Sequence, residues 1–229
     1  MITSGYPYSS ARKTEVVDVV NGESCADLAD FPVENEGAVG ANLHGTPIVC
    51  GGYSSGWSKT CYKLTNAGWQ EFASMNEGRA YAAGIMFKNK FHVFGGFGDG
   101  SSILQTSEII SIDGSVEDGP ELPESVYWHA ITSINSTVSL LSGGLTSATN
   151  WSPLTWFFNH ETQAFSSGPS LLEGRSLHGS ATIVDKVTKA KISMVTGGYN
   201  GGYLDTTELL INGMWQSGTI QCPKMAIMF

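Results

Sequence analysis

The segment Phe91-His92-Val93-Phe94-Gly95-Gly96 is a short apolar run that ends in a diglycine, and the chain repeats this pattern three more times. The other doublets are Gly51-Gly52, Gly143-Gly144 and Gly197-Gly198, each behind its own apolar run. Short apolar runs bounded by glycines are typical of buried β-strands. Four doublets at intervals of 44 to 54 residues therefore indicate an array of similar all-β units.

The remainder of each unit repeats as well. A polar, Gly/Ser-rich loop follows each doublet, and a second strand then carries aromatic residues: Tyr62 and Trp69 in one unit, Phe158 and Phe165 in another, and Trp215 in a shortened last version. Large aromatics bury much surface between packed sheets, and glycine permits the close approach of backbones. We therefore expect these aromatics and the diglycines to be scaffold. Three other strands open with a Ser/Thr-Glu pair, at Thr14-Glu15, Ser107-Glu108 and Thr207-Glu208.

An apolar strand ending in Gly-Gly, with Tyr and Trp about six residues apart on the next strand, resembles the kelch repeat. The resemblance covers nearly the whole chain, and Cys50-Gly51-Gly52 with Cys61-Tyr62 looks like the cysteine-containing kelch proteins of arthropods. The third unit departs from the pattern, with Ser111 and Val116 in the aromatic positions. The resemblance implies an all-β kelch-type β-propeller as a single domain over 1-229, with units of about 1-33, 34-78, 79-124, 125-174 and 175-229.

Kelch propellers usually have six or seven blades, whereas this chain holds about five units. Met1-Ile2-Thr3 enters on the second strand of a unit, and residues 225–229 stand where a first strand should begin. Either the last strand pairs with the first unit and closes a five-bladed ring, or the chain is part of a larger, six-bladed ring. We expect the six-bladed arrangement, since no strand precedes Ile2.

Composition agrees with one all-β domain. The chain has 229 residues, of which 28 are glycine and 14% are charged, as expected where short strands and tight turns dominate. Its net charge of −9 disfavours nucleic acid and anionic membranes as partners. The sequence contains no apolar run long enough for a transmembrane helix, so we expect no membrane insertion.

Four cysteines, Cys25, Cys50, Cys61 and Cys222, allow three complete pairings. Cys50 ends one strand and Cys61 begins the next, so a hairpin would bring them to disulfide range. Cys25 and Cys222 occupy similar points of the first and fifth units, and their state is left open. We expect no metal site, because there is no Cys-x-x-Cys pair and the histidines do not cluster at ligand spacing.

Two triplets are acceptor sequons for N-glycosylation in expected surface turns, Asn135-Ser136-Thr137 and Asn150-Trp151-Ser152. Together with a disulfide they favour an oxidising, extracellular compartment. A cytoplasmic location is the alternative, because no signal-peptide pattern opens the chain.

Specificity in propellers resides in the loops at the ends of the central channel. Arg79 and Arg175 occupy matching positions in the segments that open two units, and arginine suits bidentate capture of a carboxylate. The alternative is that each arginine pairs with a local glutamate. The same segments supply the further candidates Glu36, Trp128, His129 and His178, and candidate aromatic anchors are Tyr6, Tyr53, Trp57, Tyr127 and Trp151.

The leading hypothesis is a non-catalytic, cofactor-free binding module that presents these loops to a protein, a peptide or a glycan. One alternative is an intracellular kelch adaptor, in ubiquitin-ligase recruitment or actin binding, whose second domain is missing. The other is a sugar-acting propeller enzyme. An oxidase of this type would need a Tyr/Cys crosslink and two histidine ligands, which have no match here; an epimerase would have to use Glu77, Arg79, His129, Arg175 and His178.

Overall fold

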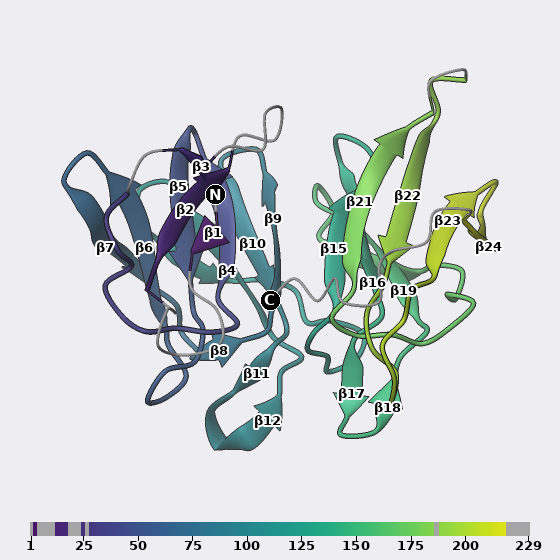
Figure 1. The fold of residues 1–229 in the computed structure, drawn as a ribbon, viewed down its shortest axis with the longest axis horizontal. Coiled ribbons are helices and arrows are strands. Elements are labelled where there is room, and N and C mark those ends of the chain that lie inside the picture. Colours follow the sequence, from purple (N-terminus) through teal and green to yellow (C-terminus); the bar gives the residue numbers. More distant parts are fainter. Residues whose placement is uncertain (1, 4–11, 18–23, 26–27, 186–187, 219–229) are drawn as a thin grey trace.

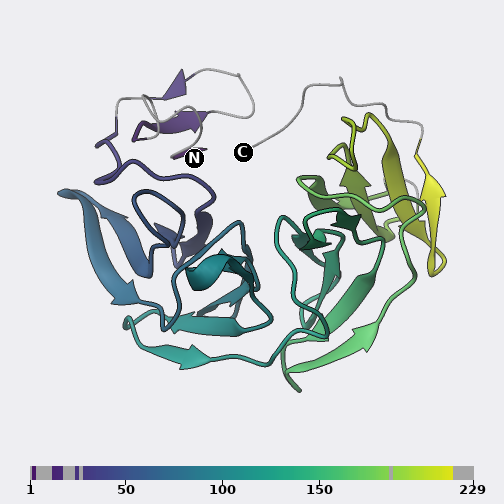
Figure 2. The ribbon, with the colours of Figure 1, turned by 90° about the horizontal axis from the view of Figure 1, so that it is seen from below.

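The computed structural model describes residues 2–3, 12–17, 24–25, 28–185 and 188–218, and its main elements are antiparallel β-sheets. A three-stranded sheet of β1 (Ile2–Thr3), β2 (Thr14–Val17) and β3 (Ser24–Cys25) comes first. Four four-stranded sheets follow, and in Figure 2 the five sheets succeed one another around an arc in chain order. The expectation of an all-β, propeller-like fold is confirmed.

The four-stranded sheets share one pattern. The second comprises β4 (Val39–Leu43), β5 (Thr46–Cys50), β6 (Thr60–Thr65) and β7 (Gly68–Ser74), and the third β9 (Ala83–Phe87), β10 (Lys90–Phe94), β13 (Ser107–Ser111) and β14 (Val116–Asp118). The fourth comprises β15 (Ala130–Ser133), β16 (Val138–Ser142), β19 (Thr155–Asn159) and β20 (Ala164–Ser167), and the fifth β21 (Gly179–Val184), β22 (Lys191–Thr196), β23 (Thr207–Ile211) and β24 (Met214–Ser217). The first strands β4, β9, β15 and β21 pack against one another in that order and form the inner side of the arc.

Smaller elements gather at one end of the molecule. The strand β8 (Arg79–Ala80) pairs with β11 (Phe97–Gly98), which also pairs with β12 (Ser102–Ile103), and a 3-10 turn (Asp99–Ser101) joins β11 to β12. β17 (Leu145–Ser147) pairs with β18 (Asn150–Trp151). Figure 1 shows β8, β11, β12, β17 and β18 together at the lower end, opposite the turns between the first two strands of each sheet. The loops that follow each diglycine and the loops that open each unit therefore share one face.

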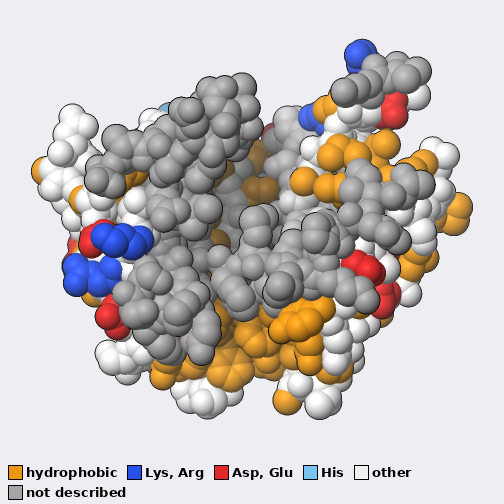
Figure 3. Space-filling model, in the orientation of Figure 1, with side chains coloured by type: hydrophobic (Ala, Val, Ile, Leu, Met, Phe, Trp, Pro, Cys, Tyr) orange, Lys and Arg blue, Asp and Glu red, His pale blue; other side chains and the backbone are white. Residues whose placement is uncertain are grey.

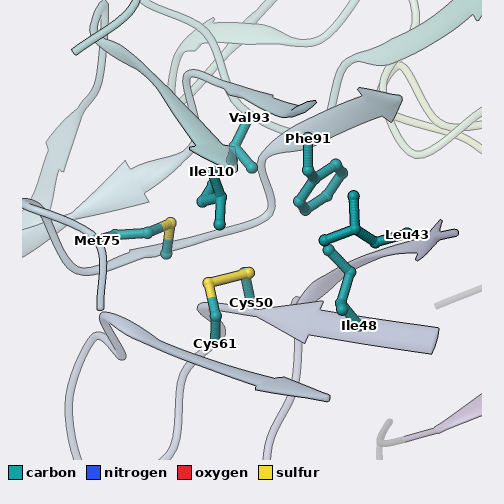
Figure 4. Close-up of a cluster of buried hydrophobic side chains, with 8 residues drawn as sticks. All are labelled: Leu43, Ile48, Cys50, Cys61, Met75, Phe91, Val93 and Ile110. Atoms are coloured by element: carbon teal, nitrogen blue, oxygen red, sulfur yellow. A yellow bond between two sulfur atoms is a disulfide. The ribbon is translucent and has the colours of Figure 1, made fainter. Parts of the chain in front are cut away.

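The hydrophobic core lies between neighbouring sheets. One cluster packs Leu43, Ile48 and Met75 against Phe91 and Ile110, and so joins the second sheet to the third (Figure 4). Equivalent clusters join the third sheet to the fourth and the fourth to the fifth. The expected scaffold aromatics are part of this core, since Phe158 is fully buried and Trp215 is 5% exposed. In the third unit Ile110 and Val116 take the place of the missing aromatics.

Three of the four diglycines hold their own unit to the next one. The amide of Gly52 donates to the carbonyl oxygen of Arg79 at 2.8 Å, and Gly96 and Gly144 donate likewise to Val126 and Arg175. A Cβ atom on the first glycine of each of these pairs would collide with the same carbonyl oxygen. Both glycines also have positive φ, so no other residue type fits the contact without strain. The diglycine repeat is thus a repeat of inter-sheet joints.

A disulfide joins Cys50 to Cys61 across β5 and β6, with Cα atoms 4.0 Å apart, in the pairing expected of that hairpin. Both cysteines are fully buried in the cluster of Figure 4. Cys222 and the side chain of Cys25 lie outside the described residues, as do Tyr6 and the segment 225–229 on which ring closure was argued.

Candidate functional site

A belt of backbone hydrogen bonds runs around the inner side of the arc at the lower end. The amide of Tyr81 donates to Gly37, that of Trp128 to Tyr81, and that of Leu177 to Trp128, at 2.7 to 3.0 Å. All four residues have φ between 55° and 65°. Bulky residues rarely adopt this conformation, and three successive units adopt it at equivalent positions. The belt thereby fixes the side chains of Tyr81 and Trp128 at the loop face.

Six aromatic side chains at this face contact one another in a continuous path, which we call the aromatic circuit. They are, in order, Tyr53, Trp57, Phe97, Tyr127, Trp128 and Tyr81, and successive ring centroids lie 4.6, 5.2, 5.2, 4.7 and 5.3 Å apart. The rings come from three consecutive units. The circuit therefore exists only when the second, third and fourth sheets are packed together.

Glu36 closes the circuit at its two ends. Its Oε1 accepts a hydrogen bond of 2.8 Å from the Tyr81 hydroxyl, and its backbone exchanges two hydrogen bonds with the backbone of Tyr53. A carboxylate thus stands beside the two rings that end the circuit, Tyr81 and Tyr53. Of the loop candidates named from the sequence, the structure brings Glu36, Tyr53, Trp57, Tyr127 and Trp128 together at one place.

The circuit is partly accessible to solvent. All six rings are partly exposed, and Figure 3 shows hydrophobic side chains gathered at the lower end, where β11, β12, β17 and β18 lie. Partial burial raises the pKa of the Tyr127 hydroxyl, which therefore stays protonated at neutral pH. An exposed cluster of contiguous aromatic side chains is typical of a binding surface.

Arg79 lies behind this face. Its side chain is fully buried, Nη1 donates to the carbonyl oxygen of Gly95 at 2.8 Å, and Nη2 donates to Glu108 at 2.8 Å and to Glu77 at 3.1 Å. The local pairing that was the alternative from the sequence is therefore what the structure shows. The guanidinium is not presented to a ligand, because its charge is held by two carboxylates of the same sheet and loop.

Arg175 repeats the arrangement in the fifth sheet. It is fully buried, and it donates to Gly197 at 2.8 Å, to Glu208 at 2.7 Å and to Glu173 at 3.4 Å. The second oxygen of Glu208 accepts from the amide of Leu172. Each arginine thus ties the loop that opens its unit to the third strand of the same sheet. Both guanidinium groups are thus paired within their own units.

His129 and His178 are also buried. Burial lowers the pKa of His129 to about 4, and burial together with the positive charge of Arg175 lowers the pKa of His178 to about 3. His178 is hydrogen-bonded to Ser142 through Nε2 at 3.0 Å. Both imidazoles are neutral at pH 7 and pack against the diglycines, so they belong to the joints between sheets and not to the loop face.

A second feature lies at the opposite end, between the third and fourth sheets. A cleft of about 530 Å³ is lined by Phe87, Lys88, Ser139, His160 and Glu161, among others. His160 stacks on Phe87 and is hydrogen-bonded to Ser139 at 2.7 Å, and its ring centroid lies 5.1 Å from that of His92. Burial is the main cause that lowers the pKa of both histidines to about 4. Ser139 is 1% exposed, so this is a buried hydrogen bond between β16 and the turn that follows β19.

The acceptor asparagines of both sequons are exposed, but only the first sequon lies in a turn, because Asn150 and Trp151 form β18 and Ser152 is buried. Asn135 occupies the turn between β15 and β16, where its Oδ1 accepts from the Thr137 amide at 2.9 Å. Asn150 begins β18 and donates to Thr146. Trp151, the remaining aromatic anchor candidate in the described residues, contacts Tyr199 at 5.9 Å, outside the aromatic circuit.

Sequence reasoning missed two members of the circuit, Tyr81 and Phe97. Tyr81 stands in the segment Arg79-Ala80-Tyr81, and Phe97 directly follows a diglycine, at the position that Tyr53 occupies in the preceding unit. Alignment of the units on their diglycines would have found Phe97. No comparable signal marks Tyr81, whose position depends on its positive φ.

The sheet order, the shared inner side and the inter-sheet joints define an all-β protein of the β-propeller class. It is similar to the solved structure of YjhT, with a TM-score of 0.78 over 90% of this chain and 77% of that one, at 13% sequence identity. Identity at this level shows the fold alone. No protein-family model matches the chain, and no curated protein matches its sequence.

Two features are absent from the described residues. Within the described residues no group of histidine, cysteine and carboxylate side chains is arranged to hold a metal ion. The described part of the chain also contains no helix with the length and apolar character needed to cross a bilayer. The aromatic circuit brings aromatic ring surface, the Glu36 carboxylate and backbone groups together at the loop face.

Proposed function

We propose that this chain is a kelch-type propeller that acts as a non-catalytic binding module, with the aromatic circuit as its contact surface for a protein or glycan partner. The observation that carries the proposal is the circuit itself, six partly exposed rings in mutual contact at the loop face. Tyrosine and tryptophan are the residues most enriched among energetically dominant interface anchors. Their rings lose few rotatable bonds on binding, which limits the entropy cost.

The burial of four of the five candidate acid–base groups supports binding over catalysis; the fifth, Glu77, is 44% exposed and is paired with Arg79. Arg79 and Arg175 are engaged by carboxylates within their own sheets, and His129 and His178 are enclosed between sheets. A sugar epimerase built on these residues would need at least some of them to reach substrate. The aromatic circuit provides no equivalent acid–base pair.

We infer further that the native ring has six blades, to which this chain contributes about five. The arc of described sheets in Figure 2 supports this number, since its first and last sheets stand apart. We also propose an extracellular location, supported by the buried disulfide and by the exposure of Asn135 and Asn150. Intact mass of the native protein, with and without reduction and deglycosylation, tests the location and the extent of the chain together.

Ligand selection on the purified protein tests the binding function. A random twelve-residue peptide display library and a glycan array are probed in parallel with the native chain and with the double variant Trp57→Ala/Trp128→Ala. We expect at least one ligand class to be retained by the native chain and to lose tenfold or more in affinity on the variant. Tyr203→Ala, which removes a 58% exposed ring outside the circuit, is the matched control. Ligands that bind all three proteins equally would contradict the proposal.

A further inference from the structure

The fifth unit has the diglycine of a joint but no described partner for it. In the three complete joints, the second glycine donates its amide to a carbonyl oxygen of the next unit at 2.8 to 2.9 Å. Gly197 and Gly198 have φ of 64° and 104°, which fall within the ranges of the other pairs, 58–70° and 99–106°. Gly198 is buried, yet no described residue accepts a hydrogen bond from its amide. Because buried amides nearly always have an acceptor, we expect one outside the described residues.

The backbone belt stops at the same unit. Each earlier carbonyl oxygen of the belt accepts an amide of the next unit, whereas no described amide donates to the carbonyl oxygen of Leu177. In the complete joints one segment meets both groups, because the residue that accepts from the diglycine stands two positions before the residue that donates to the belt, as Arg175 does before Leu177. The fifth sheet is the last of the arc (Figure 2). The Gly198 amide and the Leu177 carbonyl therefore form one donor and one acceptor for a single further segment.

A third hydrogen bond gives the sequence position of that segment. One glycine in each of the third, fourth and fifth units donates its amide to the first residue of the third strand of its own sheet, at 2.7 to 2.9 Å; these are Gly119, Gly168 and Gly218. In the third and fourth units, the residue that accepts from the diglycine follows this glycine by seven positions, at Val126 and Arg175. Seven positions after Gly218 is Met225, and two further is Ile227. Both lie outside the described residues.

We propose that the segment 225–227 completes the joint of the fifth unit: the amide of Gly198 donates to the carbonyl oxygen of Met225, and the amide of Ile227 donates to the carbonyl oxygen of Leu177. The fifth unit thus presents a docking surface for a segment of its own chain. Residues 225–229 are all apolar, as a first strand enclosed by neighbouring sheets requires.

Both contacts of this joint join backbone groups, so they do not depend on charge. The joint also depends neither on the proposed binding function nor on the number of blades. The segment meets the fifth unit in the same way whether it opens a sixth unit or supplies the first strand of the first unit.

Amide hydrogen exchange of the full chain, followed by NMR, tests the joint. We expect the Gly198 amide of the native chain to be protected as strongly as those of Gly96 and Gly144, to within about tenfold. Ile227→Pro removes the amide donor and cannot adopt positive φ. It should raise the exchange rate of Gly198 by about tenfold or more and leave that of Gly96 unchanged. Ile227→Gly, which keeps the donor and adopts positive φ freely, is the matched control and should retain most of the protection.

Each outcome supports or overturns the joint. A Gly198 amide that exchanges in the native chain as fast as an unprotected amide overturns it. Protection of Gly198 that survives Ile227→Pro means that another group is the acceptor, which overturns the assignment to the segment 225–227. If Ile227→Pro raises exchange at Gly96 and Gly198 alike, the glycine variant decides: equal loss of protection there contradicts a role for the Ile227 amide, and retained protection supports it.

Discussion

At the scale of single residues, the first glycine of each doublet is the position least able to change. Gly143 has φ of 61°, and a Cβ atom there would overlap the carbonyl oxygen of Arg175, which Gly144 uses as its hydrogen-bond acceptor. The backbone at Arg175 cannot move away from an added Cβ atom without breaking this hydrogen bond and opening the joint between the fourth and fifth sheets. We expect Gly143→Ala to lower the free energy of unfolding by about 3 kcal/mol or more, measured by urea titration.

Gly45 provides a comparison in which an alanine substitution adds backbone strain but no steric clash. It has φ of 82°, but an added Cβ would meet nothing within 4 Å. Gly45→Ala should therefore cost only the strain of positive φ, about 1–2 kcal/mol. Equal losses for the two variants would show that the close approach at Gly143 has no energetic weight.

Trp128 has φ of 55° and supplies both an aromatic ring and a link of the backbone belt. A non-glycine residue pays about 1–2 kcal/mol in this conformation, whereas glycine adopts it freely and loses about 0.5–1 kcal/mol more backbone entropy. We therefore expect Trp128→Gly to unfold with a free energy about 1 kcal/mol greater than that of Trp128→Ala. At a position with negative φ the alanine variant would be the more stable of the two. The difference between the two variants, measured by thermal melting, therefore reports the backbone strain at Trp128.

At the scale of elements, the buried arginines connect loops to strands. Arg175 is fully buried, and Glu208 is 2% exposed. The Nη2 atom of Arg175 lies 2.7 Å from the Oε1 atom of Glu208. Arg175→Ala would leave a buried carboxylate without its partner, so we expect a loss of about 3–5 kcal/mol in stability.

The solvent-exposed pair Lys13–Asp30 provides the comparison, at 68% and 46% side-chain exposure. Lys13→Ala should cost no more than about 1 kcal/mol. A mild loss for Arg175→Ala, combined with loss of ligand binding, would contradict the structural role and return this arginine to the binding site. Denaturant titration and calorimetric binding on the same preparations distinguish the outcomes.

The same elements show what the sequence can and cannot predict. A repeated diglycine and spaced aromatics predict the sheets and their core, because every unit must satisfy the same packing. The Ser/Thr-Glu pairs are equally regular, but Glu108 and Glu208 meet their arginines 29 and 33 residues away, and only the folded sheet brings them together. The place of Tyr81 in the aromatic circuit could not be predicted either, because it depends on the positive φ of this residue, and tyrosine rarely adopts that conformation.

At the scale of the whole molecule, histidines are enclosed between successive sheets. His92 and His160 lie between the third and fourth sheets, and His129 and His178 pack against the diglycines of the third and fourth units. The pKa values of three of these groups are lowered to about 4, and that of His178 to about 3, with burial as the main cause. All four titrations act on the packing between successive sheets and therefore on global stability.

The sign of the pH dependence follows from these shifts. In the unfolded chain each histidine takes up a proton near pH 6.5, whereas in the folded chain it does so only near pH 4 or below. The stability of the fold is therefore complete above pH 6.5 and falls as the pH drops toward 4, by up to about 1.4 kcal/mol per pH unit for each histidine.

We expect urea titrations at pH 7.5, 6.5, 5.5 and 5.0 to show little change between the first two values and a steep loss between the last three. His129→Leu removes one of the four titrations without removing a hydrogen bond that the described residues make to that ring. It should therefore lower the slope between pH 6 and 5 by about a quarter. A flat profile down to pH 5 would mean that the histidines take up protons without opening the joints, and the enclosed imidazoles would then have no part in holding successive sheets together.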